Sequence, residues 1–421
     1  MAVETSRTIY IALQSTGILE LSFDPSERDV QKALFVTSTC SSSGKMPGWL
    51  TSHRDSDKIY SISRLHYPDE SAESGGLFAF RQRRPSKASS PSGEPGPGLA
   101  PVNERSSTGK GGVHIDVSPD GKLLAAANIS GSTVSLFPVD EDSGAVGEPS
   151  ATIYYDGERE GPAVNEGKGF ANPHEARFDW TGRFLFVPLR SADKLDVYAV
   201  DGALGKLTKI HSVELPPKTG PRHTAIHRFD AKTSYCYLLS EKDNTIRAFE
   251  LTYGQNDSGP SSSNAGAQQH DDLRICLKQT ISLLETQPVQ GQRFLGAEVA
   301  ASNDGKFLYA SNRFYPVDSV DGDTLSIYRI NPGHASSPSD GNENHLTYIG
   351  SSKVLGHSPR MFALSNDETN RFVAVANAYD QEIVVFERDL EKGFLKDVRG
   401  RVKLGENDST LRNGPVCVLW K

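Results

Sequence analysis

Residues 415–420 read PVCVLW, a short run of residues that favour β-strands. Six similar runs occur along the chain, and each leads through a turn into a second, longer hydrophobic run. They are PGWLTS at 47, GVHIDVS at 112, PHEARFD at 173, PRHTAIH at 221, GAEVAAS at 296 and SPRMFALS at 358. Residues 7–24 form a second run without a lead before it. The run at 415–420 fits that vacant place.

Each second run consists of two stretches rich in Val, Ile, Leu, Tyr and Phe with a polar break between them. Clear copies cover residues 121–137, 182–198, 234–251, 305–330 and 370–387, and weaker copies cover 7–24 and 57–83. The pairs Asp120-Gly121 and Asp304-Gly305 stand between lead and second run. Such pairs favour two-residue hairpins. Because no long stretch keeps a 3.6-residue period, these runs predict strands and not helices.

Internal repetition of about 40 to 50 residues is typical of propellers and solenoids. A solenoid needs capped ends, whereas here the last run completes the first unit, so we predict an all-β, seven-bladed β-propeller closed by its C-terminal strand. The alternative is an open all-β array. One domain is expected over residues 1–421, with mobile inserts rich in Pro, Ser, Gly or polar residues near 84–110, 253–272 and 332–345.

The composition argues against several classes of partner. The net charge is −8 and Lys and Arg do not cluster, so neither nucleic acid nor an anionic membrane is expected as a partner. No apolar stretch is long enough to span a bilayer, and the first residues lack the pattern of a signal peptide. The four cysteines show no metal-type spacing and lie mostly in strand patterns. We therefore expect them to be buried and the protein to be cytoplasmic.

Aligning the repeats shows where charge recurs. The second residue of each lead run, or its equivalent, gives Gly48, His114, His174, Arg222, Glu298, Arg360 and Val416. The position after the first strand of the second runs gives Arg64, Ile129, Arg190, Glu241, Arg313 and Ala378. Nine of these thirteen residues are ionisable and five are Arg. Since guanidinium groups bind carboxylate or phosphate bidentately, the ring predicts a small anionic ligand. Alternatively, Arg222, Arg313, Glu241 and Glu298 pair with one another and only hold the blades together.

Within this set we predict His174, Glu241, Arg222 and Arg313 to be catalytic, and His114, Arg190, Glu298 and Arg360 to bind substrate. A neutral His174 in an electropositive pocket suits a general base, and Glu241 would orient it or act as an alternative base. Arginine neighbours repel cations, so no metal is expected. The glycine-rich stretches lack phosphate-loop or dinucleotide spacing, no cofactor is expected, and Gly-x-Ser-x-Gly is absent.

Five stretches carry a family resemblance: NPHEARFDWTGRFLFVP (172–188), GPRHTAIH (220–227), YLLSEKDNTI (237–246), GAEVAASNDGKFLYASNR (296–313) and SPRMFAL (358–364). In them the chain resembles the seven-bladed propeller lactonases, a family that includes bacterial 6-phosphogluconolactonase and fungal 3-carboxy-cis,cis-muconate lactonizing enzyme. The resemblance implies active residues at His174, Arg222, Glu241 and Arg313. It implies hydrolysis of a small anionic lactone, and the alternatives are a muconate cycloisomerase and a propeller that binds without turnover.

Overall fold

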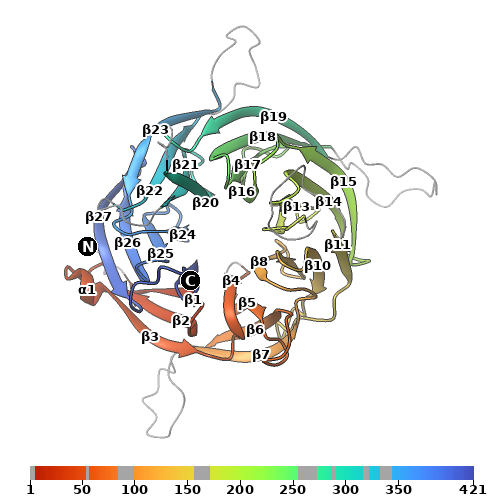
Figure 1. The fold of residues 1–421 in the computed structure, drawn as a ribbon, viewed down its shortest axis with the longest axis horizontal. Helices are drawn as coiled ribbons and strands as arrows, with labels where there is room; N and C mark the ends of the chain where they lie inside the picture. The colour runs from red at the N-terminus through yellow and green to blue at the C-terminus, as the bar shows by residue number, and fades with distance from the viewer. Residues whose placement is uncertain are drawn as a thin grey trace, which may run out of the picture.

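The computed structural model describes residues 5–53, 56–83, 98–155, 171–254, 273–285, 291–315, 322–331 and 344–421. These residues form seven four-stranded antiparallel sheets arranged as blades around a central axis, with a single four-residue helix, α1 (Val30–Ala33) (Figure 1). The predicted seven-bladed β-propeller is therefore confirmed. In the described residues no helix is long and apolar enough to cross a membrane.

The two inner strands of the blades carry the lead runs and the first halves of the second runs. The innermost strands are β28 (Pro415–Trp420), β4 (Lys45–Thr51), β8 (Gly112–Val117), β12 (Arg177–Phe178), β16 (Pro221–Arg228), β20 (Arg293–Ala301) and β24 (Pro359–Leu364). The strands that follow outward are, in the same blade order, β1 (Arg7–Leu13), β5 (Lys58–Leu65), β9 (Leu123–Asn128), β13 (Phe184–Leu189), β17 (Thr233–Ser240), β21 (Phe307–Tyr315) and β25 (Phe372–Asn377).

The outer half of each blade also consists of two strands. The third strands are β2 (Gly17–Phe23), β6 (Gly76–Arg83), β10 (Thr133–Pro138), β14 (Lys194–Asp201), β18 (Thr245–Tyr253), β22 (Thr324–Ile330) and β26 (Glu382–Arg388). The outermost strands are β3 (Leu34–Cys40), β7 (Gly98–Ser106), β11 (Ala151–Tyr154), β15 (Lys206–Glu214), β19 (Leu273–Ser282), β23 (Leu346–Lys353) and β27 (Leu395–Lys403). The sequence repeat did not reveal this outermost set, because these strands are half exposed and carry few large apolar residues.

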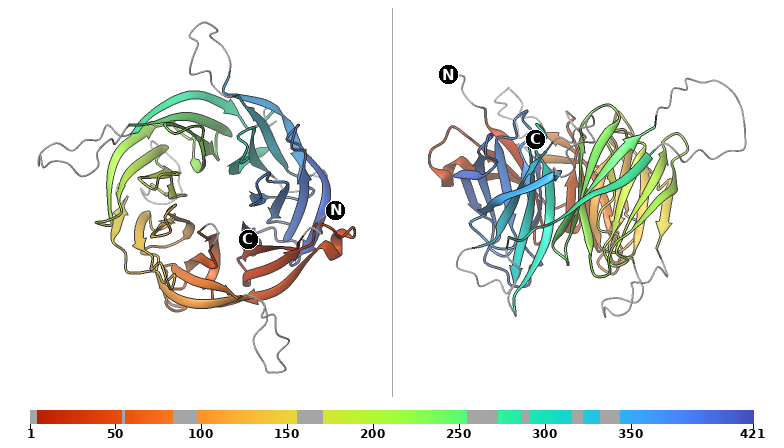
Figure 2. Two further views of the ribbon diagram at one scale, coloured as in Figure 1. Left: turned by 180° about the vertical axis from the view of Figure 1, so that it is seen from behind. Right: turned by 90° about the horizontal axis from the view of Figure 1, so that it is seen from above.

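The ring closes by pairing the two ends of the described chain. Strand β28 runs antiparallel to β1, with Ile9 opposite Trp420 and Leu13 opposite Pro415. The C-terminus accordingly lies beside β1 at the channel (Figures 1 and 2). The indole N–H of Trp420 also donates a hydrogen bond of 3.0 Å to the carbonyl oxygen of Ala363, which lies in the neighbouring blade. The predicted closure by residues 415–420 is confirmed.

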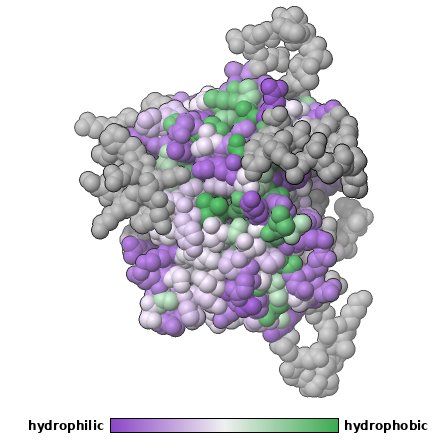
Figure 3. All heavy atoms as spheres, turned by 90° about the vertical axis from the view of Figure 1, so that its right-hand side faces the viewer, coloured by the Kyte–Doolittle hydropathy of each residue, from purple (hydrophilic) through white to green (hydrophobic). Residues whose placement is uncertain are grey.

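The hydrophobic core lies between neighbouring blades, where the faces of adjacent sheets meet. Strand β9 is buried along its whole length, as is β25. Large aromatic side chains such as Tyr60, Tyr198 and Tyr309 are fully buried there. The coloured part of the side seen in Figure 3 is mainly polar, with scattered hydrophobic patches. Burial thus concentrates at the blade contacts, which hold the inner strands in a fixed ring.

Several local expectations need correction. Asp120 and Gly121 do not form a two-residue hairpin, since Val117 pairs with Leu124 and a longer turn connects them. Residues 98–106, expected within a mobile insert, form β7 and complete a blade, because this stretch pairs with β6. His345, at the end of another expected insert, is buried and bonds to Tyr237. The remaining parts of the three inserts lie mainly outside the described residues.

The cysteine prediction is half correct. All four cysteines are free, and Cys236 and Cys417 are buried, but Cys40 is only partly buried and Cys276 is exposed. The last two lie on outermost strands, where most side chains are exposed or half-buried.

Candidate functional site

The inner strands do not pair regularly with their neighbours near the start of each strand. In β16, Pro221 lies opposite Ser240 and His223 opposite Leu239, so Arg222 is the extra residue of a β-bulge. Equivalent bulges interrupt β4, β8, β20, β24 and β28. A bulge re-aims the side chain that it carries. Here it places two successive residues per blade toward the channel.

These residues form two rings. The first ring, at the bulge position, consists of Gly48, Val113, His174, Arg222, Ala297, Arg360 and Val416. The second ring, one residue further along, consists of Trp49, His114, Glu175, His223, Glu298, Met361 and Cys417.

This register corrects the sequence alignment at two places. His114 and Glu298 were expected at the position of His174, but Val113 and Ala297 occupy that position and the two charged residues lie in the second ring. The repeat could be aligned without gaps in either register, and only the bulge decides between them. Gly48 has no side chain because a Cβ there would lie 2.3 Å from the carbonyl oxygen of Gly112 in the next blade.

Glu241 is held by two arginines next to the first ring. Its Oε2 accepts a hydrogen bond of 2.5 Å from Nε of Arg190, and its Oε1 accepts one of 2.7 Å from Nη2 of Arg313. Burial works to raise the pKa of Glu241, but Arg313, Arg190 and Arg222 outweigh it and hold the pKa well below its usual range. Glu241 is therefore a carboxylate committed to these arginines, and the predicted pairing of Glu241 with Arg313 is present.

Three further guanidinium groups gather at the first ring without a carboxylate. Arg64 and Arg360 are half-buried and line one small cavity together with Arg222. Arg222 donates to the carbonyl oxygen of Ala297 and approaches the His223 ring at 3.3 Å. Among the described residues, no hydrogen bond or ion pair joins any of the three to a carboxylate.

The pKa directions agree with this crowding of positive charge. Burial, followed by the charges of Arg64, Arg222 and Arg313, lowers the pKa of Arg360 to about 9. Burial and Arg313 lower the pKa of Arg222 to about 10, although Glu241 opposes this. Since proximity of like charges disfavours the charged form, the cluster is electrostatically unsatisfied and would gain from an anion.

His174 precedes β12 and points into the same small cavity. Its Nδ1 lies 3.1 Å from Nε2 of His223, and its backbone N–H bonds to the carbonyl oxygen of Pro188. Burial and then Arg222 hold the pKa of His174 well below its ordinary value, so its imidazole is neutral at pH 7. In the described part of the chain the His174 ring shares a hydrogen bond with His223, whereas the oxygens of Glu241 bond to Arg190 and Arg313.

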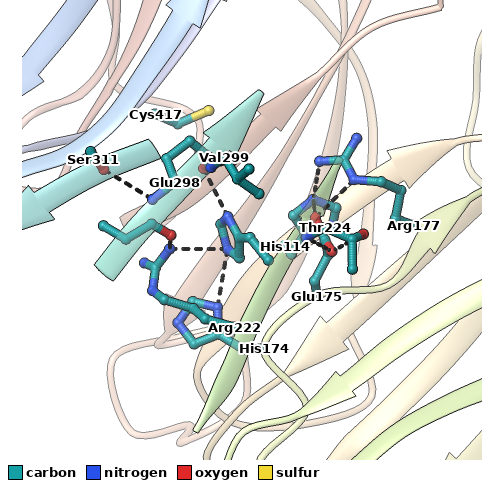
Figure 4. A network of polar contacts seen from close by, with 12 residues as sticks. His114, His174, Glu175, Arg177, Arg222, Thr224, Glu298, Val299, Ser311 and Cys417 are labelled. Atoms are coloured by element: carbon teal, nitrogen blue, oxygen red, sulfur yellow. Dashed lines mark hydrogen bonds and ion pairs between the residues drawn. The ribbon is translucent and has the colours of Figure 1, made fainter. Parts of the chain in front are cut away.

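The second ring contains a separate buried network (Figure 4). Glu175 accepts hydrogen bonds from the backbone N–H and the hydroxyl of Thr224, at 2.7 and 2.6 Å, and from Nε of Arg177 at 2.8 Å. His114 lies 3.5 Å from Glu175, and burial holds its pKa far below the usual value. These residues connect three blades and satisfy one another, so His114 is better explained as part of this network than as a substrate contact.

Two cavities lined by described residues lie along the inner strands. The smaller, at the first ring, encloses about 10 Å³, and His174, Arg64 and Arg360 are among its walls. The larger, about 890 Å³, lies toward the opposite ends of the inner strands and reaches Glu298 and Trp49. Size alone favours the larger cavity as a binding site.

The charges favour the smaller cavity. In the larger one, Arg177 is paired with Glu175, Arg228 lies over the Trp180 ring and Lys421 bonds to backbone oxygens. Each of those three cationic groups is thus already engaged, whereas Arg64 and Arg360 line the smaller cavity. In the described residues no group of three or more His, Cys, Asp or Glu is arranged to hold a metal ion.

Comparison with known proteins places the chain in a family. Residues 6–420 match the family model described as lactonase, 7-bladed β-propeller. The chain belongs to this family. The match covers all seven blades and both ends of the closure, β1 and β28, so the family's fold extends over the whole ring.

Relatives within the family carry lactonase names. A protein named 6-phosphogluconolactonase from Formosa agariphila is 27% identical over 298 residues, which are 70% of this chain and 72% of that protein. One of the same name from Bacillus subtilis is 24% identical over 89% of this chain and 87% of its own length. The solved structure of a periplasmic gluconolactonase from Pseudomonas aeruginosa has a TM-score of 0.72, covers 99% of both chains and is 20% identical. At that identity it supports the fold alone.

The structure places the eight predicted site residues in three groups around the channel. His174, Arg222 and Arg360 share the small cavity, while Glu241 bonds to Arg190 and Arg313 beside it. His114 and Glu298 lie one ring deeper. Sequence reasoning missed His223, Glu175 and Arg177, although each stands within one to three residues of a predicted position in PHEAR or PRH.

Proposed function

We propose that the protein is a lactone hydrolase, acting like a 6-phosphogluconolactonase on a small sugar lactone that carries an anionic group. The observation that carries the proposal is the cluster of Arg64, Arg222 and Arg360 beside a neutral His174. The membership in the lactonase family and the names of its relatives support the same reaction.

The arginine cluster supplies the anion site of this proposal. Arg64 and Arg360 present guanidinium forks to the small cavity, and such forks bind phosphate or carboxylate bidentately. A cavity of about 10 Å³ holds only about one water molecule. Both side chains are half-buried and must move apart when a sugar lactone enters. We therefore expect binding to rearrange Arg64 and Arg360 rather than the strands that carry them.

His174 supplies the base. A neutral imidazole takes a proton from water as the water oxygen attacks the lactone carbonyl, and charge develops on the carbonyl oxygen. Arg222 lies within reach of that charge and stabilises it. The C–O bond of the ring then breaks, and the proton held by His174 passes to the leaving oxygen. The products are a carboxylic acid and a free hydroxyl, so atoms and protons balance with water as the only co-reactant.

In this mechanism Glu241 has a structural role and does not act as an alternative base. Its two oxygens bond to Arg190 and Arg313, so both of its acceptors already hold guanidinium groups. We propose that it neutralises these two arginines and fixes Arg313 next to Arg222. The positive charge left without a partner is then confined to one side of the channel.

The test is substrate consumption by the purified protein. Incubation with 6-phosphogluconolactone should release acid faster than spontaneous hydrolysis, and the His174→Ala variant should lose that excess rate. Incubation with 3-carboxymuconate tests the cycloisomerase alternative, which gains no support from the relatives named above. If neither compound is consumed faster than in buffer, the hydrolase proposal fails and a binding propeller takes its place.

We also propose a cytoplasmic location. It is supported by the four free cysteines, which include the exposed Cys276. Cell fractionation with compartment markers tests it, and recovery in an extracytoplasmic fraction would contradict it.

A further inference from the structure

A chain of three side chains runs from the small cavity to the large one. His174 lines the small cavity, and its Nδ1 lies 3.1 Å from Nε2 of His223. The other nitrogen of His223, Nδ1, lies 2.8 Å from Oε2 of Glu298. Glu298 lines the large cavity. In Figure 4, Glu298, Arg222 and His174 lie close together, and Glu175 and Arg177 form a separate group.

In a neutral imidazole one ring nitrogen carries a hydrogen and donates, and the other ring nitrogen accepts. Two directions are therefore possible. In one, His174 donates to His223 and His223 donates to Glu298, which leaves Nε2 of His174 as a bare acceptor. In the other, Glu298 carries a proton and donates, and Nε2 of His174 then carries a hydrogen and cannot act as a base.

Arg222 selects between these directions. Its Nη1 lies 3.3 Å from Nε2 of His223, and a guanidinium group has hydrogens to donate but no acceptor. Nε2 of His223 then accepts, its one lone pair being shared between Arg222 and His174, so the hydrogen of this ring sits on Nδ1 and points to Glu298. His174 can bond to the same Nε2 only by donating from its own Nδ1.

We propose that His223 and Glu298 are positioning residues that, together with Arg222, hold His174 in the tautomer whose Nε2 is free to accept a proton. The inference rests on the proposed function, in which His174 is the base. It assigns roles to His223, which the sequence did not single out, and to Glu298, which was expected to touch substrate. Such control of a base by its second nitrogen follows general histidine chemistry.

The backbone holds Glu298 rigidly enough for this role. Its own N–H donates to the hydroxyl of Ser311 at 3.0 Å, and its Oε1 accepts from the N–H of Val299 at 3.1 Å. The second oxygen is left to His223. Charged or titratable groups facing Glu298 are Arg222 and His223 on β16, Arg177 on β12 and Cys417 on β28.

Hydrogen positions test the proposal directly. Neutron diffraction from crystals of the deuterated, ligand-free protein at pH 8 should show deuterium on Nδ1 of both His174 and His223 and none on Nε2 of His174. Deuterium on Nε2 of His174 with a bare Nδ1 would overturn the proposal. This readout needs no turnover, so it decides the tautomer even if the protein does not hydrolyse 6-phosphogluconolactone and the proposed function fails.

Kinetics with 6-phosphogluconolactone provide the second test. His223→Phe and Glu298→Leu should each lower kcat by at least about 10-fold, because a base in the wrong tautomer loses most of its effect. KM should stay within about twofold, since Arg64 and Arg360 are untouched. Glu298→Gln keeps one acceptor oxygen, which can serve either His223 or the N–H of Val299, so its kcat should lie between those of wild type and Glu298→Leu.

A matched control is Glu387→Gln, which removes a carboxylate that binds Arg371 and Arg399 far from the channel. It should leave kcat and KM unchanged. A near-normal kcat in folded His223→Phe would overturn the proposal, as would a rise in KM without a fall in kcat. If a variant fails to fold by circular dichroism, the neutron map decides.

Discussion

The Oε1 atom of Glu241, directly after β17, accepts a 2.7 Å hydrogen bond from Nη2 of Arg313 on β21 of the next blade. The contact is buried and links two blades close to the channel. Removing one partner of a buried ion pair typically costs about 3 to 5 kcal/mol, because the other charge is left without compensation. Glu241→Gln should therefore lower the free energy of unfolding by roughly this amount at pH 7, as measured by urea titration.

The pH dependence gives the control. The pKa of Glu241 lies below its unfolded value, so its contribution is complete above about pH 4.5 and is lost as the pH falls below that value. The difference between wild type and Glu241→Gln should shrink at pH 3.5. An equal difference at both pH values would show that charge is not the cause.

His174 should be required for turnover but not for folding. Among the described residues its side chain makes one hydrogen bond, with His223, and general-base catalysis is worth about 10² to 10⁴ in rate. We expect His174→Gln to reduce kcat at least about 10²-fold while the melting temperature changes little. A folded variant with kcat near that of the wild type would remove His174 from the mechanism.

Arg360 should bind anions at the expense of stability. Its pKa is lowered to about 9 by burial and by Arg64 and Arg222, so its charge is unfavourable in the empty site. Arg360→Gln should raise the melting temperature of the free protein slightly and raise KM about 10-fold or more, since hydrogen bonds to charged groups contribute about 1.5 to 3 kcal/mol.

Added phosphate distinguishes the anion binding by Arg360 from its effect on the stability of the free protein. Millimolar inorganic phosphate should stabilise the wild type in thermal melts, because a ligand that binds only the folded state raises its stability. It should stabilise Arg360→Gln less. Arg329→Gln, which changes an exposed arginine on β22, is the matched control. An equal response to phosphate in all three proteins would place the anion site elsewhere.

Glu298 should make the fold less stable as the pH rises. Burial raises the pKa of its carboxyl to about 7, although Arg222 and Arg177 oppose this. The folded state therefore holds this proton between about pH 4.5 and pH 7, where the unfolded chain has released it, and stability falls across that window as the pH rises. Glu298→Gln should be more stable than wild type at pH 8 and equal to it at pH 4, in urea titrations. A variant less stable than wild type at pH 8 would contradict this sign.

Trp420 should be essential to ring closure. It is buried, packs edge-on against Phe23 at a centroid distance of 5.9 Å and bonds to Ala363 of the adjacent blade. Truncating a buried Trp costs about 3 to 5 kcal/mol. We expect Trp420→Ala to lose about that much stability, again by urea titration, and the neighbouring, less buried Leu419→Ala to lose clearly less. Equal losses of stability in the two variants would mean that the contacts of the Trp420 indole do not contribute more than those of Leu419.

The fold followed from the sequence because its signal is periodic. Seven copies of one strand pattern, with the missing lead found at 415–420, define the ring without any side-chain detail. The outermost strands were not predicted from the sequence, because their half-exposed residues, as in β7, show no clear alternation of apolar and polar positions.

The site was predictable only as a set of residue types. Charged residues recurred at one repeat position, which identified Arg222, His174 and Arg360. Which of them share a ring depends on the bulges, and a bulge adds one residue without a signature in the sequence. That is why Glu298 was assigned one position too early, and why His223, adjacent to Arg222, was not recognised.

The closure by β28 has a consequence for the timing of folding during synthesis. Val416 and Cys417 form the seventh part of both rings, and they follow β1 by about four hundred residues. Six blades can form in order as the chain leaves the ribosome, while β1 waits with one edge unpaired. The first blade, and with it the circle of side chains around His174, is completed only once residue 420 has emerged. A nascent chain arrested before that point should therefore expose the free edge of β1, and we expect chaperones that bind extended hydrophobic strands to protect it there.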